Sequence, residues 1–210
     1  LSRRGLLPQP HRALEVPPAQ HPAPPVQYWP EDARGMLAAV RLYVRSCQQR
    51  GVDWREAITA LRPVTARLWT SMPVPERRRF LEHLQPLWDT HRHRAAPQVW
   101  ARVEDMLAQG TLRTMAGRVA RVAPLGPRAS DPLEVTIAPR AGGEPVTLRV
   151  ARVINCTGPC SDVTRAHSPL LADLFASGLA RPDELRLGLD ARPDGALLNA
   201  EGDAGEVLWA

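Results

Sequence analysis

The sequence predicts a mixed α/β protein, because two different spacings of apolar residues follow one another along the chain. Across residues 31–110, apolar residues recur at every third or fourth position, which is the spacing of a buried helix face. From about residue 111 the spacing changes to two, which is typical of β-strands with one buried face. A short apolar run at residues 153–156 then ends in a Thr-Gly turn, which predicts one more, buried strand.

The helical region is predicted to begin with two capped helices. Glu31 and Asp32 follow a proline, and acidic residues there favour a helix start. Gly51 predicts the end of this helix, and Asp53 is placed to cap a second helix that ends before Pro63. The apolar positions that we expect to face inward are Ala33, Met36, Leu37, Val40, Val44 and Cys47 in the first helix, and Trp54, Ala57, Ile58 and Leu61 in the second.

Two further helices are predicted before the change in spacing. The first carries its apolar residues at positions 80–88 and is expected to bend at Pro86. The second is expected to start near Pro97 and to end at Gly110, because proline favours the first turn of a helix and glycine its C-terminal cap. Its predicted inward positions are Val99, Val103, Met106 and Leu107.

The strand region is predicted to contain a β-hairpin. Residues 133–137 and 146–150 alternate apolar with polar residues, and Gly142-Gly143 between them supplies the turn. Val119 and Val122 mark an earlier strand. Cys156, at the end of the later run, is expected to be a small buried residue on its strand. A helix with Leu170, Leu171, Leu174 and Phe175 follows and is expected to end at Gly178.

Composition narrows the possible functions. The formal net charge is +5, and all 27 basic residues are arginine. Nucleic-acid binders use such charge on phosphates, but these arginines are scattered and no recognition motif accompanies them, so we expect no nucleic-acid partner. No apolar run is long enough to span a membrane, and three cysteines do not make a disulfide framework. We therefore expect a cytoplasmic protein with no membrane partner.

A cluster of histidines and arginines lies near the end of the third predicted helix. His91 and His93 are two positions apart and would not converge on a metal ion, whereas Asp89 and His93 share a helix face. We therefore expect no metal site. Two interpretations remain open: a charged helix end that compensates the C-terminal dipole, or an anion or substrate contact made by His91, Arg92 or Arg94.

Three stretches together resemble one known family. They are LSRRGLLP at residues 1–8, WDTHRHRAAP at 88–97 and VINCTGP at 153–159, and the later residues 168–198 are also compatible. They resemble the bacterial FAD/NAD(P)-binding oxidoreductase group related to flavin-dependent urate hydroxylases and, more distantly, to ornithine N-hydroxylases. The resemblance covers most of the 210 residues.

This resemblance implies part of a flavoprotein with two dinucleotide-binding domains, a helical insertion and an antiparallel β-meander. Residues 1–30 would be the rim of the NAD(P)-binding domain and a proline-rich connector, and residues 31–110 the helical region. Residues 111–210 would be the β-meander and the return into the FAD-binding domain. The whole enzyme would be an FAD-dependent, NADPH-using oxidoreductase, with small-molecule monooxygenation as its expected reaction.

The resemblance also assigns candidate cofactor residues. Ser2, Arg3 and Arg4 would follow a strand of the NAD(P) domain, where an arginine fork suits the 2′-phosphate of NADPH. At the other candidate site, a glycine without a Cβ lets the backbone approach the flavin nucleotide closely. The residues implied there are Thr157, Gly158 and Pro159.

The sequence departs from the family in one respect, since it contains no G-x-G-x-x-G phosphate loop. We therefore expect a fragment, truncated at both ends, that is inactive alone, and we assign no catalytic acid or base. The alternative is a basic helical module that binds an acidic protein or nucleic acid without catalysis.

Overall fold

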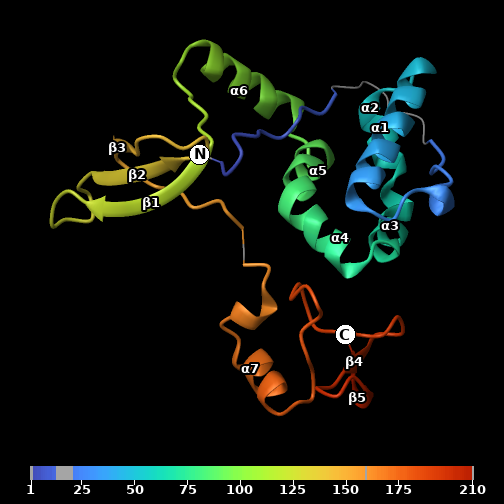
Figure 1. The fold of residues 1–210 in the computed structure, drawn as a ribbon. Helices are drawn as coiled ribbons and strands as arrows, with labels where there is room; N and C mark the ends of the chain where they lie inside the picture. Colours follow the sequence, from blue (N-terminus) through green and yellow to red (C-terminus); the bar gives the residue numbers. More distant parts are fainter. Residues whose placement is uncertain (1, 13–20, 159, 210) are drawn as a thin grey trace. The chain divides into compact units, whose positions relative to one another are not determined.

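In the computed structural model the chain divides into two compact units, Leu1–Val153 and Ile154–Ala210, which are described separately below. The structure describes residues 2–12, 21–158 and 160–209. Both units are mixed α/β, with helices preceding antiparallel strands in each (Figure 1). The expectation of a mixed α/β chain with an antiparallel meander is therefore confirmed.

The four predicted helices of the first unit occur in the predicted order, and the structure adds two short helices, at 65–71 and 74–79, that were not predicted. Asp32 caps the first by accepting a hydrogen bond from the Gly35 N–H at 2.8 Å, and Asp53 caps the second through the Arg55 N–H at 2.8 Å. Gly51 stands after the first helix with a φ of +79°, as its predicted end requires. The helices are α1 (Ala33–Gln49), α2 (Trp54–Ala60), α3 (Thr65–Ser71), α4 (Val74–Arg79), α5 (Gln85–Arg92) and α6 (Pro97–Ala108).

The predicted bend at Pro86 takes the form of a π-helical turn, Phe80–Leu84, between α4 and α5. In this turn the Gln85 N–H bonds to the carbonyl of Phe80, five residues earlier. Proline has no N–H, so Pro86 cannot donate to the Glu82 carbonyl as an α-helix would require. The irregularity therefore lies one turn before the proline that causes it.

The core of the helical region lies where α1 and α2 meet. Ala57 and Leu61 have no exposed surface, and Met36 and Cys47 of α1 are also buried. Burial does not extend to α6, where Val99 is 57% exposed and no described residue is fully buried. The prediction that Val99 faces inward was therefore wrong, because its helix packs too little surface against the rest of the unit.

The sheet of the first unit is the predicted meander. Its strands pair antiparallel in the order β1 (Gly117–Pro124), β2 (Leu133–Pro139) and β3 (Val146–Val150). A β-bulge lies between Val119 and Arg121 of β1. Val135 and Ile137 of the central strand are buried, while the flanking strands expose much of their apolar surface. The hairpin turn uses Gly142 and Gly143, whose φ angles of +81° and +97° suit glycine.

Residues 2–12, which we call the N-terminal strap, run across elements that come much later in the chain. Ser2 forms an isolated parallel bridge with Ala116, and its carbonyl accepts from the Gly117 N–H at 3.0 Å. The Gln9 N–H donates to the Thr90 carbonyl at 2.8 Å. The strap therefore joins the start of the sheet to the end of α5.

The expected buried strand at residues 153–156 is absent. This segment has no strand pairing, and Ile154 and Cys156 are exposed, Ile154 to 81%. Both the strand and the buried position of Cys156 were therefore wrong predictions. The reason is physical: a buried strand needs a neighbouring strand to bond its backbone, and the described residues offer none at this point.

The second unit holds one helix and a two-stranded sheet. Helix α7 (Pro169–Ala176) is capped by Ser168 and is followed by Gly178 with a φ of +71°, as predicted. Strands β4 (Ala196–Leu198) and β5 (Ala204–Trp209) pair antiparallel. An ion pair between Arg181 and Asp190 at 2.8 Å ties the loop between α7 and β4 together.

Candidate functional site

The first candidate site, Ser2 with Arg3 and Arg4, lies on the N-terminal strap. Ser2 is held by its backbone bridge to Ala116, and the Arg3 side chain is exposed. The Arg4 guanidinium turns to the π-helical turn and donates to the carbonyls of Glu82 and His83, the latter at 3.0 Å. Of the two predicted phosphate ligands, Arg4 is therefore already engaged with backbone carbonyls, whereas the Arg3 side chain is exposed.

The position of Arg4 has a physical reason. Glu82 loses its α-helical donor because Pro86 has no N–H, so its carbonyl needs another partner. The Arg4 guanidinium supplies that partner. Sequence reasoning missed this contact because it joins residues 78 positions apart. The sequence gives only a weak signal for this contact. A proline inside a helical pattern leaves a carbonyl without its N–H donor, but nothing in the sequence shows which arginine binds that carbonyl.

The second candidate site is the turn at Thr157 and Gly158; Pro159 lies outside the described residues. The Asn155 side-chain oxygen accepts from the Thr157 N–H at 3.1 Å and from the Thr157 hydroxyl at 2.8 Å. Gly158 has a φ of +77°, and apart from its chain neighbours no atom of the described residues lies within 4 Å of where a Cβ would stand. The turn is thus locally ordered and open on the side of its glycine.

A third cluster surrounds Trp54 at the start of α2. The guanidiniums of Arg55 and Arg94 lie 4.5 and 5.8 Å from the centroid of its ring, and the His91 ring meets its edge at 5.4 Å. Arg94 also donates to the Arg55 carbonyl and to the Thr59 hydroxyl, both at 3.0 Å. Its Nε is buried without a hydrogen-bond partner among the described residues.

Positive charge is concentrated in this cluster. Burial, followed by the charges of Arg55, Arg92 and Arg62, lowers the pKa of Arg94. Burial and the charge of Arg62 likewise lower the pKa of Arg92. Among the described residues, no carboxylate lies within ion-pair distance of Arg62, Arg92 or Arg94. The cluster therefore carries an excess of positive charge.

The histidines at the end of α5 contact groups of the same helix. No group of three or more His, Cys, Asp or Glu residues in the part of the chain that the structure describes is placed to hold a metal ion. His91 Nδ1 lies 2.8 Å from the Leu87 carbonyl, and His93 Nε2 lies 4.0 Å from Asp89 Oδ1. The prediction that Asp89 and His93 share a helix face is confirmed.

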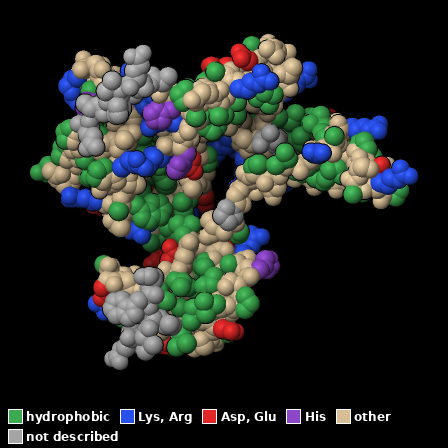
Figure 2. All heavy atoms as spheres, turned by 180° about the vertical axis from the view of Figure 1, so that it is seen from behind, with side chains coloured by type: hydrophobic (Ala, Val, Ile, Leu, Met, Phe, Trp, Pro, Cys, Tyr) green, Lys and Arg blue, Asp and Glu red, His purple; other side chains and the backbone are tan. Residues whose placement is uncertain are grey.

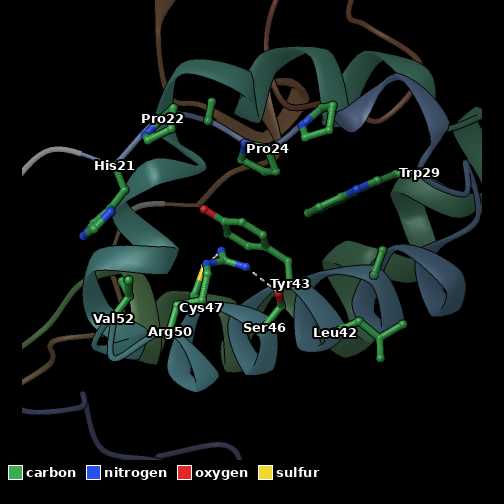
Figure 3. A pocket seen from close by; sticks show the side chains of 13 residues that line it. His21, Pro22, Pro24, Trp29, Leu42, Tyr43, Ser46, Cys47, Arg50 and Val52 are labelled. Carbon is green, nitrogen blue, oxygen red and sulfur yellow. Dashed lines mark hydrogen bonds between the residues drawn. The ribbon is translucent and has the colours of Figure 1, made fainter.

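A pocket of about 710 Å³ lies over α1, and sequence reasoning did not find it (Figure 3). We call it the α1 pocket. It combines side chains of α1 with the proline-rich segment that precedes that helix. Its lining residues are His21, Pro22, Ala23, Pro24, Pro25, Trp29, Ala39, Leu42, Tyr43, Ser46, Cys47, Arg50 and Val52. The sequence does place an aromatic residue, Tyr43, and a cationic residue, Arg50, near the C-terminal end of α1. It does not show that residues 21–25 fold back over them to form the second wall of the pocket.

A second pocket of about 510 Å³ opens among α1, α2, the π-helical turn and α5. It is mainly apolar, with the side chains of Val40, Trp54 and Phe80 in its wall and Arg41 and Arg45 also in its lining. Neither of these two pockets includes the candidate cofactor residues.

The described residues do not by themselves form a dinucleotide pocket. At the NADPH candidate, one of the two guanidiniums is already bound to backbone carbonyls. At the flavin candidate, Gly158 offers open space for a close approach, but no described side chain closes around that space. We therefore derive no catalytic step through either cofactor.

Comparisons with known proteins leave these sites unassigned. None of the helices in the described ranges is both long and apolar enough to cross a membrane. In a search of protein families no family matches the chain, and in a search of curated proteins none matches it.

Proposed function

We propose that this chain is part of an FAD-dependent, NAD(P)H-using oxidoreductase that acts on a small molecule, with monooxygenation as its reaction. The three sequence stretches quoted above are the basis for the family. In this proposal the strap and the Thr157–Gly158 turn each contribute one edge of a nucleotide pocket, and other sequence of the enzyme completes both pockets.

The observation that carries the proposal is the unpaired segment at residues 153–156. It has the composition of a buried strand, yet Ile154 is 81% exposed and Val153 is 44% exposed. It leads directly to Gly158, whose left-handed backbone leaves its Cβ side open. A parallel sheet edge would bond this backbone and cover these side chains, and in dinucleotide-binding folds the turn after such a strand faces the nucleotide.

Exposed apolar surface on the second unit supports the same proposal. Leu170 is 66% exposed and Leu179 is 55% exposed, and Figure 2 shows hydrophobic side chains gathered on the surface of this unit. Contiguous apolar surface of this kind marks a contact with another element. The remainder of an FAD-binding domain would supply that contact.

The first test uses the protein as its gene encodes it, with whatever precedes Leu1 and follows Ala210. We expect the purified protein to show flavin absorbance that bleaches when NADPH is added without oxygen. Gly158→Ala is expected to lower the flavin content several-fold, because the added Cβ strains the left-handed backbone and occupies the open side of the turn. A colourless wild-type protein would overturn the proposal.

The matched control is Gly142→Ala in the hairpin. Gly142 has nearly the same φ, +81° against +77°, and equally open surroundings, but it belongs to the hairpin of the first unit and not to the predicted flavin-binding turn. It is expected to retain full flavin content. Equal losses in the two variants would show that backbone strain alone is responsible.

The nicotinamide assignment has its own test. Arg3→Ala is expected to lower the preference for NADPH over NADH by about tenfold, the effect of one charged hydrogen-bonded contact. Arg4→Ala is expected to leave that preference unchanged but to destabilise the protein, because its guanidinium holds the π-helical turn. An unchanged preference in Arg3→Ala would remove the NADPH assignment.

The arginine cluster around Trp54 favours a second candidate, a basic module that binds an acidic partner or nucleic acid. The observation that favours this candidate is the excess positive charge of Arg62, Arg92 and Arg94. If this is the function, the protein binds duplex DNA with a steep salt dependence and carries no flavin. Arg62→Gln and Arg92→Gln would then each reduce the salt slope by about one. A flavin-containing protein without DNA binding excludes this candidate.

A further inference from the structure

The α1 pocket has the size of a small-molecule site. Its volume of about 710 Å³ lies within the range of about 300–1,000 Å³ that is usual for ligand pockets. It is walled on one side by α1 and on the other by residues 21–25, of which Pro24 is buried. Proline fixes the backbone of this second wall, so the pocket exists before a ligand enters.

The walls of the pocket suit a flat apolar group. The rings of Trp29 and Tyr43 lie with their centroids 6.1 Å apart and are inclined by 54°, so neither ring covers the face of the other. Figure 3 shows the Tyr43 side chain projecting from α1 into the space beneath Pro22 and Pro24. An aromatic ligand can pack against these ring faces and the proline rings.

One cationic group stands in this largely apolar pocket. The Arg50 guanidinium donates to the Ser46 hydroxyl at 2.7 Å and to the Cys47 sulfur at 3.4 Å, as the dashed lines in Figure 3 mark. These bonds use two of its five N–H donors. In the described ranges no carboxylate lies within ion-pair distance of it. Its charge is therefore available to a ligand.

The other polar groups of the pocket are neutral or already paired. His21 Nε2 lies 3.4 Å from Glu56 Oε2. Burial, followed by contact with the Cys47 thiol, raises the pKa of Tyr43 to about 12, so its hydroxyl keeps its proton at neutral pH and can donate a hydrogen bond. Among the described lining residues, Arg50 is the cation without an ion pair and Tyr43 offers a hydroxyl donor, so the pocket matches a singly charged carboxylate better than a phosphate dianion.

We propose that the α1 pocket binds a planar aromatic carboxylate, with its ring against Trp29 and Tyr43 and its carboxylate on Arg50. All of these residues belong to the first unit. The proposal is therefore independent of the flavoprotein assignment, and flavin content does not report on it. The ligand enters as a substrate or effector of the same chain.

The test is calorimetric titration of the protein with three probes. They are 2-naphthoate, its neutral analogue 2-naphthalenemethanol, and cyclohexanecarboxylate, which keeps the charge without the aromatic ring. We expect 2-naphthoate to bind at least about tenfold more tightly than either of the others, since it alone satisfies both features of the pocket. Equal binding of naphthoate and the alcohol would overturn the role of Arg50.

Variants locate the site. Arg50→Gln is expected to weaken naphthoate binding by about tenfold or more and to leave the binding of the alcohol unchanged. Arg45→Gln is the matched control, because Arg45 lies within α1, the helix that Arg50 caps at its C-terminus, but lines the other pocket. It is expected to change neither affinity. If both variants weaken naphthoate equally, the attraction is a general effect of net charge and the proposed site is wrong.

Tyr43→Phe separates the hydroxyl from the ring. We expect it to weaken naphthoate binding a few-fold, while Tyr43→Leu weakens both aromatic probes because the ring face is lost. Circular dichroism establishes that each variant is folded. Unchanged binding of both aromatic probes to a folded Tyr43→Leu protein would show that they bind elsewhere.

Discussion

The contact between α1 and α2 differs sharply from the segment at residues 153–156, although both carry apolar residues in a regular pattern. Where the two helices meet, Met36, Ile58 and Leu61 are buried, and Leu61 has no exposed surface. In the later segment Ile154 is 81% exposed. The pattern is satisfied in the first case because both partner elements lie in this chain. A periodic apolar pattern therefore predicts which side chains favour burial, but they are buried only where another element packs against them.

The largest effect is expected inside the helix pair. Leu61→Ala should lower the free energy of unfolding by about 2–5 kcal/mol, because it removes a fully buried side chain and leaves a cavity. The Val99 side chain on α6 is 57% exposed, so Val99→Ala should change the free energy of unfolding by no more than about 0.5 kcal/mol. Urea unfolding followed by circular dichroism measures both, and similar costs would contradict the described core.

A smaller effect is expected where the strap meets the π-helical turn. Arg4→Ala should cost about 1 kcal/mol, because the Glu82 carbonyl then has only water as a partner. Arg3→Ala is the comparison, since its side chain is exposed, and should stay within about 0.5 kcal/mol. The same urea unfolding experiment decides, and equal stability of the two variants would contradict the contact.

The cap of α2 adds a pH dependence. Burial of Asp53 opposes ionisation, but hydrogen bonds from Arg55 and the charges of Arg55 and Arg12 outweigh it and lower the pKa of this carboxyl. A lowered pKa contributes stability that is complete above the unfolded pKa of about 3.9 and is lost as the pH falls through the folded value.

Asp53→Asn keeps a capping oxygen but removes the charge. Its stability should therefore fall less than that of the wild type when the pH is lowered from about 6 to about 3. Urea midpoints across this range measure the difference. Parallel pH profiles would show that the Asp53 charge contributes nothing to folding.

The smallest effect is expected at the exposed segment. In these 210 residues alone, Ile154→Ser should leave stability unchanged within about 0.5 kcal/mol, since little apolar surface is buried there. In the protein with its flanking sequence, the proposed sheet edge would cover Ile154, and the same substitution should cost more than about 1 kcal/mol. Thermal unfolding of both proteins sharpens the comparison, and equal small effects in both would count against a covering sheet.

Local signals in the sequence predicted local structure well. Asp32 and Asp53 cap the helices assigned to them, and Gly142 lies in the expected hairpin turn. These predictions held because a cap or a turn needs only a few neighbouring residues. Burial at Val99 and Cys156 was mispredicted, since burial depends on elements far away in the sequence.

The candidate sites show the same division. The resemblance assigned Arg3 and Arg4 the same role, but the structure separates them, because the orphan carbonyl near Pro86 takes up Arg4. The α1 pocket could not be predicted, since Trp29 and Tyr43 meet only through the path of the intervening chain. Long-range contacts of this kind are set by packing, for which one sequence carries no periodic signal.

The N-terminal strap has a consequence for the connectivity of the molecule. Its backbone hydrogen bonds to Thr90, Ala95, Met115 and Gly117 join residues before the proline-rich connector to residues far beyond it. A protease cut between residue 12 and residue 21 would leave all of these bonds in place. The two resulting polypeptides would stay associated as a nicked protein, and separate expression of residues 1–12 and 21–210 would be a route to reconstitution by complementation.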